Sequence, residues 1–197
     1  MSNQQYKPIL FSTEMVKAIL RGQKTMTRRE VKGSFLTILN NDWPTGENVV
    51  SKGLFSPYGR PGNILWVRET FSPSSFTESG FIYKADDTPL CSGWKPGIHM
   101  PKQACRIFLE IVDVRVERLQ NITEEDAEKE GVHKQFQPLF NEDRYKCYMF
   151  KNQCWRSAIS SFQSLWSSIN GVESWDKNPW VWVIEFKRIP KPENFIT

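Results

Sequence analysis

RIFLEIVDVRVERL, residues 106–119, decides the class of fold because it is the longest stretch with the alternating pattern of a β-strand. Its apolar residues keep one parity up to Ile111 and take the other parity from Val112 onward. A change of parity inside one strand predicts a bulge or an exchange of faces, which small barrels use. We therefore expect one long strand whose inward face changes along its length.

Other segments predict strands and helices in an irregular order. ILWVRETF (64–71) and WVWVIEFKRI (180–189) have the composition of strands. Apolar spacing and capping residues predict helices over 12–21, 122–132 and 155–170. Because strands and helices do not alternate in a repeating unit, we expect an α+β fold, a small mixed β-barrel with helices at its mouth.

The length of 197 residues suits one domain, 1–197, with insertions. Segments 33–63 and 72–105 are rich in Gly, Pro and polar residues and exceed ordinary connections between elements. Segment 134–154 is polar and aromatic without a period. We expect ordered insertions or lids at 33–63 and 72–105, with most of 33–63 in loop, and an insertion at 134–154.

Charge, hydropathy and cysteine usage indicate a cytoplasmic protein. The formal net charge of +4 permits contact with nucleic acid or phosphate without requiring it. No apolar run approaches the ~20 residues of a membrane helix, and the first ten residues lack the layout of a signal peptide. Cys91, His99 and Cys105 are conceivable zinc ligands, but reduced structural thiols are the better interpretation, so we expect no metal and no cofactor.

GQKTMTRR, residues 22–29, is the densest chemical motif of the chain. Between Lys24 and Arg29 it places three cations and two hydroxyls. A lysine three residues before a threonine can be a base beside a nucleophile, and flanking arginines can hold an anion. A solvated basic turn is the alternative for the segment alone. The pairing needs Lys24 and Thr27 on one side, so we expect non-strand backbone over 24–29.

Four segments in order resemble the ASCH domain family, part of the PUA-like superfamily of RNA- and nucleoside-binding barrels. The resemblance extends from about residue 8 to residue 189, and WKPGIHMPKQACRIFLEI is similar to longer ASCH-like proteins of bacteriophages. That similarity implies the cytoplasm of a bacterial host. Small members of the family are much shorter and lack the three insertions. The four segments are the first helix with GQKTMTRR, PGNILWVRETF, LQNITEEDAEKEGV and WVWVIEFKRI.

The G-x-K-T-x-T-x-R pattern resembles one branch of the family, amidohydrolases that remove the acetyl group from N4-acetylcytidine. The resemblance implies Lys24 as proton acceptor, Thr27 as nucleophile and Glu130 as proton donor, with Arg29 at the arginine of the motif. The chemistry is coherent, because a threonine hydroxyl needs an adjacent base and lysine serves when burial or neighbouring cations lower its pKa. Glu130 as an acid needs a raised pKa. Arg28 and Arg29 are expected to contact the substrate.

Four residues outside the motif are further candidates for substrate binding. Arg68 and Glu69 are adjacent at the end of a strand, so their side chains point to opposite sides and one of them is expected to reach the pocket. Trp94, in a loop, can stack on a base. His99 lies in a loop bounded by prolines, which can present it to a ligand. Surface or packed positions are the alternatives for all four.

These observations favour a protein directed at nucleosides or nucleic acids, most specifically an amidohydrolase acting on N4-acylated cytidine or a similar modified base. Its partner is then a modified nucleoside or nucleotide, or a single-stranded nucleic acid. A module that binds RNA, single-stranded DNA or a modified base without chemistry is the alternative. A ribonuclease fits less well, because the sequence has no His pair and no metal-carboxylate cluster. The oligomeric state is not defined by the sequence.

Overall fold

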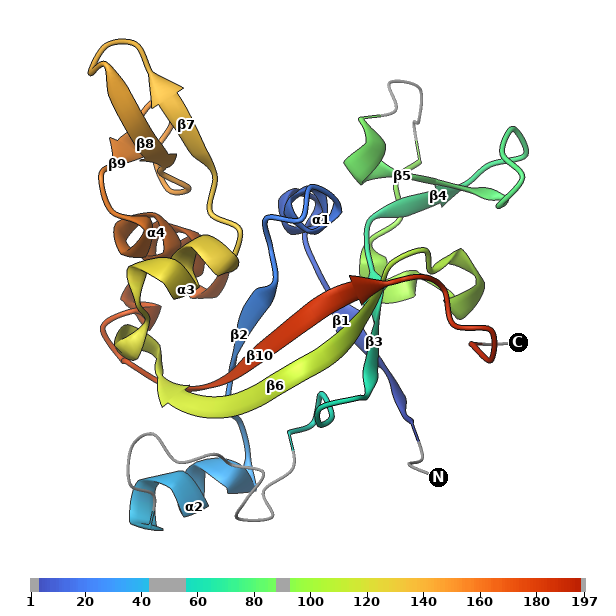
Figure 1. The fold of residues 1–197 in the computed structure, drawn as a ribbon, viewed down its shortest axis with the longest axis horizontal. Helices are drawn as coiled ribbons and strands as arrows, with labels where there is room; N and C mark the ends of the chain where they lie inside the picture. The colour runs from blue at the N-terminus through green and yellow to red at the C-terminus, as the bar shows by residue number, and fades with distance from the viewer. Residues whose placement is uncertain (1–3, 43–55, 88–92, 196–197) are drawn as a thin grey trace. The chain divides into compact units, whose positions relative to one another are not determined.

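A computed structural model describes residues 4–42, 56–87 and 93–195 (Figure 1). The chain divides into two compact units, each built from separate segments. Strands β6 (Phe108–Arg118) and β10 (Trp180–Ile189) contribute residues to both units. Unit 1 comprises 1–22, 55–113 and 185–197, and unit 2 comprises 23–54 and 114–184.

Five strands form a mixed sheet in the order β1-β3-β6-β10-β2. β1 (Tyr6–Leu10) is parallel to β3 (Ile64–Arg68), and β3 is antiparallel to β6. β2 covers Met26–Glu30. The predicted α+β class is confirmed. The predicted closure is not found, because the described strands end in two edges, β1 and β2, and Pro8 in β1 is typical of an edge since proline lacks an N–H for a further ladder.

β6 confirms the change of parity that the sequence predicts. Leu109 and Ile111 are buried on one parity, and Val114 and Val116 are buried on the other. Val112, which the pattern assigned to the second set, is 51% exposed. The inward face of the strand therefore changes between Ile111 and Val114.

Unit 1 is built around an aromatic core. Helix α1 (Thr13–Leu20) is capped by the Ser12 side chain, which accepts a hydrogen bond from the Met15 amide, and it agrees with the predicted helix over 12–21. Strands β4 (Phe71–Pro73) and β5 (Phe81–Tyr83) form an antiparallel pair. The core contains Ile64, Trp66, Phe71, Tyr83, Met100, Ala104, Cys105, Phe108 and Phe195.

Unit 2 contains three α-helices and a second, smaller sheet. α3 (Glu124–Lys129) begins after the cap Thr123, and α4 (Ala158–Asn170) begins after the cap Ser157, so both helices predicted there are confirmed with shorter bounds. The small antiparallel sheet has the order β7-β8-β9. Its strands are β7 (Lys134–Gln137), β8 (Glu142–Lys146) and β9 (Cys154–Trp155).

Two of the predicted insertions contain regular structure that the sequence did not indicate. Helix α2 (Ser34–Asp42) lies in segment 33–63, where loop was predicted, and the Phe35 ring centroid lies 5.7 Å from that of Trp182. The apolar residues of α2 have helical spacing over a short stretch only, and the Asn-Asn-Asp run that follows them is typical of a turn. Segment 134–154 forms the small sheet. Segments 43–55 and 88–92, with Pro44 and Cys91, lie outside the described residues.

Short 3-10 helices connect these elements at five places in the described chain. In that part of the chain, no helix is long and apolar enough to cross a membrane. The 3-10 helices are η2 (Lys84–Asp86), η3 (Gly97–His99), η4 (Lys102–Ala104), η5 (Leu119–Asn121) and η6 (Val172–Ser174).

Gly97 marks a close approach of two backbone segments in unit 1. The loop that contains it is joined to β4 by a bridge between Phe71 and Lys95. A Cβ atom built on Gly97 would lie 3.1 Å from the carbonyl oxygen of Arg68 and from the carbonyl carbon of Glu69. Because both contacts are to backbone, no side chain can rotate to make room.

Replacing Gly97 with alanine is therefore expected to lower the free energy of unfolding by about 1–3 kcal/mol, because the added methyl group overpacks the site. Urea denaturation followed by tryptophan fluorescence measures the change. Gly93→Ala is the matched control, since a Cβ there meets no atom within 4 Å. Equal stability of the two variants would contradict the close approach.

Candidate functional site

Lys24 and Glu130 form a buried ion pair in unit 2. They are 106 positions apart in the sequence, and the distance from Lys24 Nζ to Glu130 Oε2 is 2.7 Å. Lys24 Nζ also donates to the backbone carbonyl oxygens of Met26 and Glu130, each at 2.8 Å. The two residues are 2% and 3% exposed. The three donors of the ammonium therefore have three acceptors away from water.

The ends of two elements place this pair. Lys24 immediately precedes the segment that leads into β2, and Glu130 is the C-cap of α3. The Thr25 amide donates to the Lys129 carbonyl oxygen at 2.9 Å, which ties the two segments together. α3 stops because Gly131 takes a φ of +83°. Glu130 is therefore the last residue before the chain leaves the helix direction, and its side chain is buried.

Arg28 extends the ion pair into a larger charge network. Its guanidinium lies 2.6 Å from an Asp126 oxygen, 3.3 Å from Glu117 and 3.4 Å from Glu130. Arg115 binds the same Glu117 and Asp126 carboxylates. We call these residues the charge network: the cations Lys24, Arg28 and Arg115 and the carboxylates Glu117, Asp126 and Glu130. Its formal charges balance.

The environment of Lys24 disfavours its charged form. Burial is the largest influence and lowers the pKa of Lys24 below its usual value, because the ammonium loses its hydration. The ion pair with Glu130 raises this pKa, and the positive charges of Arg29 and Arg28 lower it. The net direction is down. A lysine with a lowered pKa beside a carboxylate can exchange a proton with it over one hydrogen bond.

Thr27 is 2% exposed and lies inside β2, between Met26 and Arg28, which are also buried. The prediction of non-strand backbone over 24–29 is wrong from Met26 onward. The strand forms because it continues into pairing with β10, and the Val31 amide donates to the Trp180 carbonyl oxygen at 2.9 Å. Lys24 precedes the strand, so strand alternation does not separate it from Thr27. Their catalytic pairing stays a prediction.

Arg68 and Glu69 have different surroundings, as their adjacency predicts. Glu69 is 1% exposed, and both of its carboxylate oxygens accept from Arg106, at 2.9 and 3.1 Å. Burial raises the pKa of Glu69, and Arg106 opposes that rise. Arg68 is half-buried, donates to the Ile98 carbonyl oxygen, and has its guanidinium carbon 5.6 Å from the Trp66 ring centroid.

Arg106 organises this second cluster of charges, which belongs to unit 1. It also donates to Asp86 at 2.8 Å, and its guanidinium carbon lies 3.9 Å from the Tyr83 ring centroid. Burial raises the pKa of Tyr83 to about 12, so its hydroxyl stays protonated and donates to the Ala104 carbonyl oxygen at 2.7 Å.

The structure brings some of the predicted site residues together and not others. Lys24, Arg28 and Glu130 meet in the charge network of unit 2. Arg29 is half-buried next to Arg28 on β2. The four other candidates belong to unit 1, where Trp94 is half-buried and His99 is exposed in η3. They are Arg68, Glu69, Trp94 and His99.

Sequence reasoning missed three members of the charge network. Arg115 and Glu117 alternate with the buried valines of β6, so their parity is a signal that could have placed them on one face. Asp126 lies in the predicted helix over 122–132, where its sequence position does not distinguish it from the neighbouring acidic residues. Among the described residues, no group of three or more His, Cys, Asp or Glu side chains is placed to hold a metal ion.

Comparisons with known proteins give one structural likeness. A scan against models of protein families found no match, and neither did a search of curated proteins. A search of solved structures found similarity to the "High resolution crystal structure of ASCH domain from Lactobacillus crispatus JV V101". The TM-score is 0.41 at 14% identity, covering 93% of this chain and 79% of that chain. A likeness at this TM-score and identity carries no argument about family or function.

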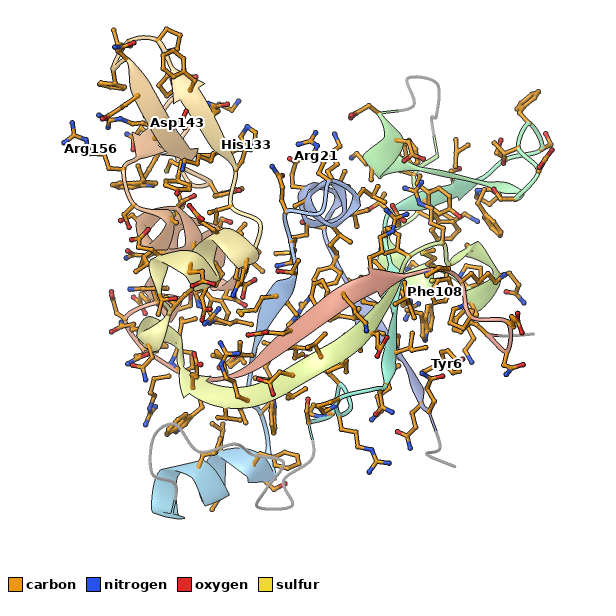
Figure 2. All side chains as sticks on the ribbon, in the orientation of Figure 1. Tyr6, Arg21, Phe108, His133, Asp143 and Arg156 are labelled. Carbon is orange, nitrogen blue, oxygen red and sulfur yellow. The ribbon has the colours of Figure 1, made fainter. Side chains whose placement is uncertain are left out.

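Removing one cation from the charge network should be costly. Arg28→Met leaves three carboxylates with only two cations, Lys24 and Arg115, so one buried negative charge is no longer balanced and the free energy of unfolding is expected to fall by about 3–5 kcal/mol. Chemical denaturation measures it. The control is Arg21→Met at an exposed position beside α1 (Figure 2), which is expected to change stability by less than about 0.5 kcal/mol. A similar small change for Arg28→Met would show that the network is not buried in solution.

Proposed function

We propose that this protein belongs to the ASCH domain family and is an amidohydrolase that removes the acyl group from N4-acylated cytidine or a similar modified base. The observation that carries the proposal is the buried ion pair of Lys24 with Glu130. These are the two residues to which the family resemblance assigns the base and the acid, and folding joins them across 106 positions. Thr27, the third residue, is buried on the adjacent strand.

The ion pair supplies both catalytic protonation states at once. Transfer of one proton from the Lys24 ammonium to the Glu130 carboxylate gives a neutral amine and a neutral carboxylic acid. Burial of Lys24 favours the neutral amine, because the buried ammonium loses its hydration and its pKa is lowered. The pair then contains one base and one acid, as amide cleavage requires.

The first half of the reaction is acyl transfer to Thr27. The neutral Lys24 amine takes the proton of the Thr27 hydroxyl, and Thr27 Oγ attacks the acyl carbonyl carbon. When the bond between that carbon and N4 breaks, Glu130 donates its proton to N4. Cytidine leaves, the acyl group is an ester on Thr27, and the pair has returned to ammonium and carboxylate.

The second half is hydrolysis of the ester. Water attacks the acyl carbon and gives a proton to the Glu130 carboxylate, while Lys24 returns a proton to the departing Thr27 Oγ. The products are the free acid and the original threonine. The total number of protons on Lys24 and Glu130 is the same before and after each half-reaction.

Arg28 acts on this chemistry through Glu130. Three carboxylates share its guanidinium, so it is a positioning residue rather than a contact to substrate. Arg29, which the resemblance places at the arginine of the motif, is the cation assigned to substrate binding.

A module that binds a modified base without chemistry is the second candidate. The observation that favours it is the full set of acceptors around Lys24 Nζ, which stabilises the ammonium rather than the amine. The two candidates differ in product formation, because a binding module binds N4-acetylcytidine and releases no cytidine.

Wild-type protein is expected to release cytidine from N4-acetylcytidine, and Thr27→Ala is expected to reduce the rate roughly a thousandfold or more because the nucleophile is lost. Chromatography of the nucleosides with ultraviolet detection measures the release. Thr27→Ser keeps a hydroxyl and is the control that should retain activity. Binding without release by the wild type would favour the second candidate, and full activity of Thr27→Ala would remove the nucleophile.

The pH dependence should show that one proton is shared. We expect kcat/KM of the wild type to fall at alkaline pH, below the usual lysine pKa of 10.5, because the pair then loses the proton needed by the leaving amine. Glu130→Gln cannot share that proton, so its residual activity should instead rise with pH as the lysine becomes neutral. Profiles of the same direction in both proteins would contradict the shared proton.

A further inference from the structure

The small sheet of unit 2 begins next to the candidate site. We call residues 133–156 the β7–β9 sheet. β7 starts at Lys134, four positions after Glu130. On β8 the Tyr145 hydroxyl donates to the Glu128 carboxylate of α3. After β8, the Tyr148 amide donates to the Ser164 hydroxyl of α4 at 3.0 Å. The sheet is therefore attached to the helix that ends in the proposed acid.

Exposed aromatic residues gather on this sheet. Five Phe or Trp side chains are exposed in the described part of the chain, and four of them belong to the β7–β9 sheet. Their exposed fractions range from 38% to 56%. Solvated rings cost free energy unless a ligand covers them, so their concentration indicates a binding surface. The four are Phe136, Phe140, Phe150 and Trp155.

Positive charge gathers on the same segment. Residues 133–156 contain five lysines and arginines and two carboxylates, which gives three of the four net positive charges of the whole chain. Glu142 binds Arg144 and Arg156, yet the Arg156 side chain is still 77% exposed. Figure 2 shows Arg156 and Asp143 projecting from this sheet. The net charge fits a polyanion.

The strand register places rings and cations side by side. Lys134 lies opposite Tyr145 and Tyr145 opposite Trp155, so the three side chains share one face, and Phe136 is on that face two positions along β7. Lys134 Nζ is 5.4 Å from the Tyr145 ring centroid. Elsewhere on the sheet, the Arg144 guanidinium carbon is 3.8 Å from the Phe140 ring centroid.

We infer that the β7–β9 sheet binds single-stranded RNA. Exposed rings stack on unpaired bases and neighbouring cations hold the phosphates, a combination that double-stranded nucleic acid cannot use because its bases are stacked on each other. A purely apolar protein partner would leave the net positive charge of residues 133–156 without a counter-charge. RNA is the polymer that contains cytidine, so this inference rests on the proposed function. It makes the modified cytidine a residue of a strand held by the sheet.

Fluorescence anisotropy with a 5′-labelled single-stranded RNA of mixed sequence tests the inference. The full-length protein should bind it, and binding should weaken steeply as the salt concentration rises, because phosphate contacts release counterions. A duplex RNA of the same sequence should bind more weakly by about tenfold or more, because its bases cannot stack on the rings.

Variants of exposed residues separate stacking from charge. Phe136→Ala with Trp155→Ala should weaken RNA binding by about tenfold or more, whereas Trp155→Phe alone, which keeps a ring, should change it little. Phe76→Ala is the matched control, since that ring is 97% exposed in unit 1. Arg156→Gln should weaken binding and reduce its salt dependence, and Lys177→Gln, also exposed, is its control.

Four results would overturn the inference: no binding of the RNA, equal binding of duplex, equal binding of the double variant, or tighter binding of single-stranded DNA. Binding to vesicles of anionic lipid in place of RNA would also overturn it and assign the sheet to a membrane surface. Cytidine release from the free nucleoside N4-acetylcytidine is measured in parallel. The double variant should retain that release, so failure of the RNA surface and failure of the amidohydrolase are distinguishable.

Discussion

The neutrality of the charge network is the constraint on which unit 2 depends. A buried lysine or carboxylate is tolerated only when an opposite charge and hydrogen bonds replace the water that it loses. Lys24 and Arg28 come from one segment, Arg115 and Glu117 come from β6, and Asp126 and Glu130 come from α3. The segment of Lys24 and Arg28 supplies two positive charges, β6 supplies one charge of each sign, and the segment of Asp126 and Glu130 supplies two negative charges. The segments must therefore assemble together, and any chemistry at Lys24 takes place in surroundings that all three have built.

Unit 1 also contains a buried carboxylate, Glu69, which is balanced by fewer charged groups. Glu69 is as buried as Glu130, but a single arginine, Arg106, supplies both of its hydrogen bonds and is itself held by Asp86 and by the ring of Tyr83. The planar guanidinium of Arg106 donates one hydrogen bond to each carboxylate oxygen of Glu69, and the protons stay on the arginine. In the Lys24–Glu130 pair, the ammonium donates a single hydrogen bond to the carboxylate. A proton can move between the two groups along that hydrogen bond.

Much of the fold follows from local sequence, and much of the site does not. The helices after Ser12, Thr123 and Ser157, and the parity change of β6, are local properties of contiguous residues. Strand β2 and the strand order depend on pairing between distant segments, which the Lys-Thr spacing could not reveal. The grouping of Lys24 with Glu130 was accessible only through the resemblance. Arg115 and Glu117 were visible as polar positions, but their partners were set by how β6 meets α3.

The change of face in β6 has a consequence for how the gene for this protein can vary. Before the change Leu109 and Ile111 point inward, and after it Val114 and Val116 do. Loss of one residue between Ile111 and Val114 would restore a uniform alternation in the strand, yet it would shift every later residue by one position. Because side chains alternate with a period of two, such a shift exchanges the valines with Arg115 and Glu117. Pairs of deletions or insertions preserve the pattern, so length variation in this strand is restricted to even steps.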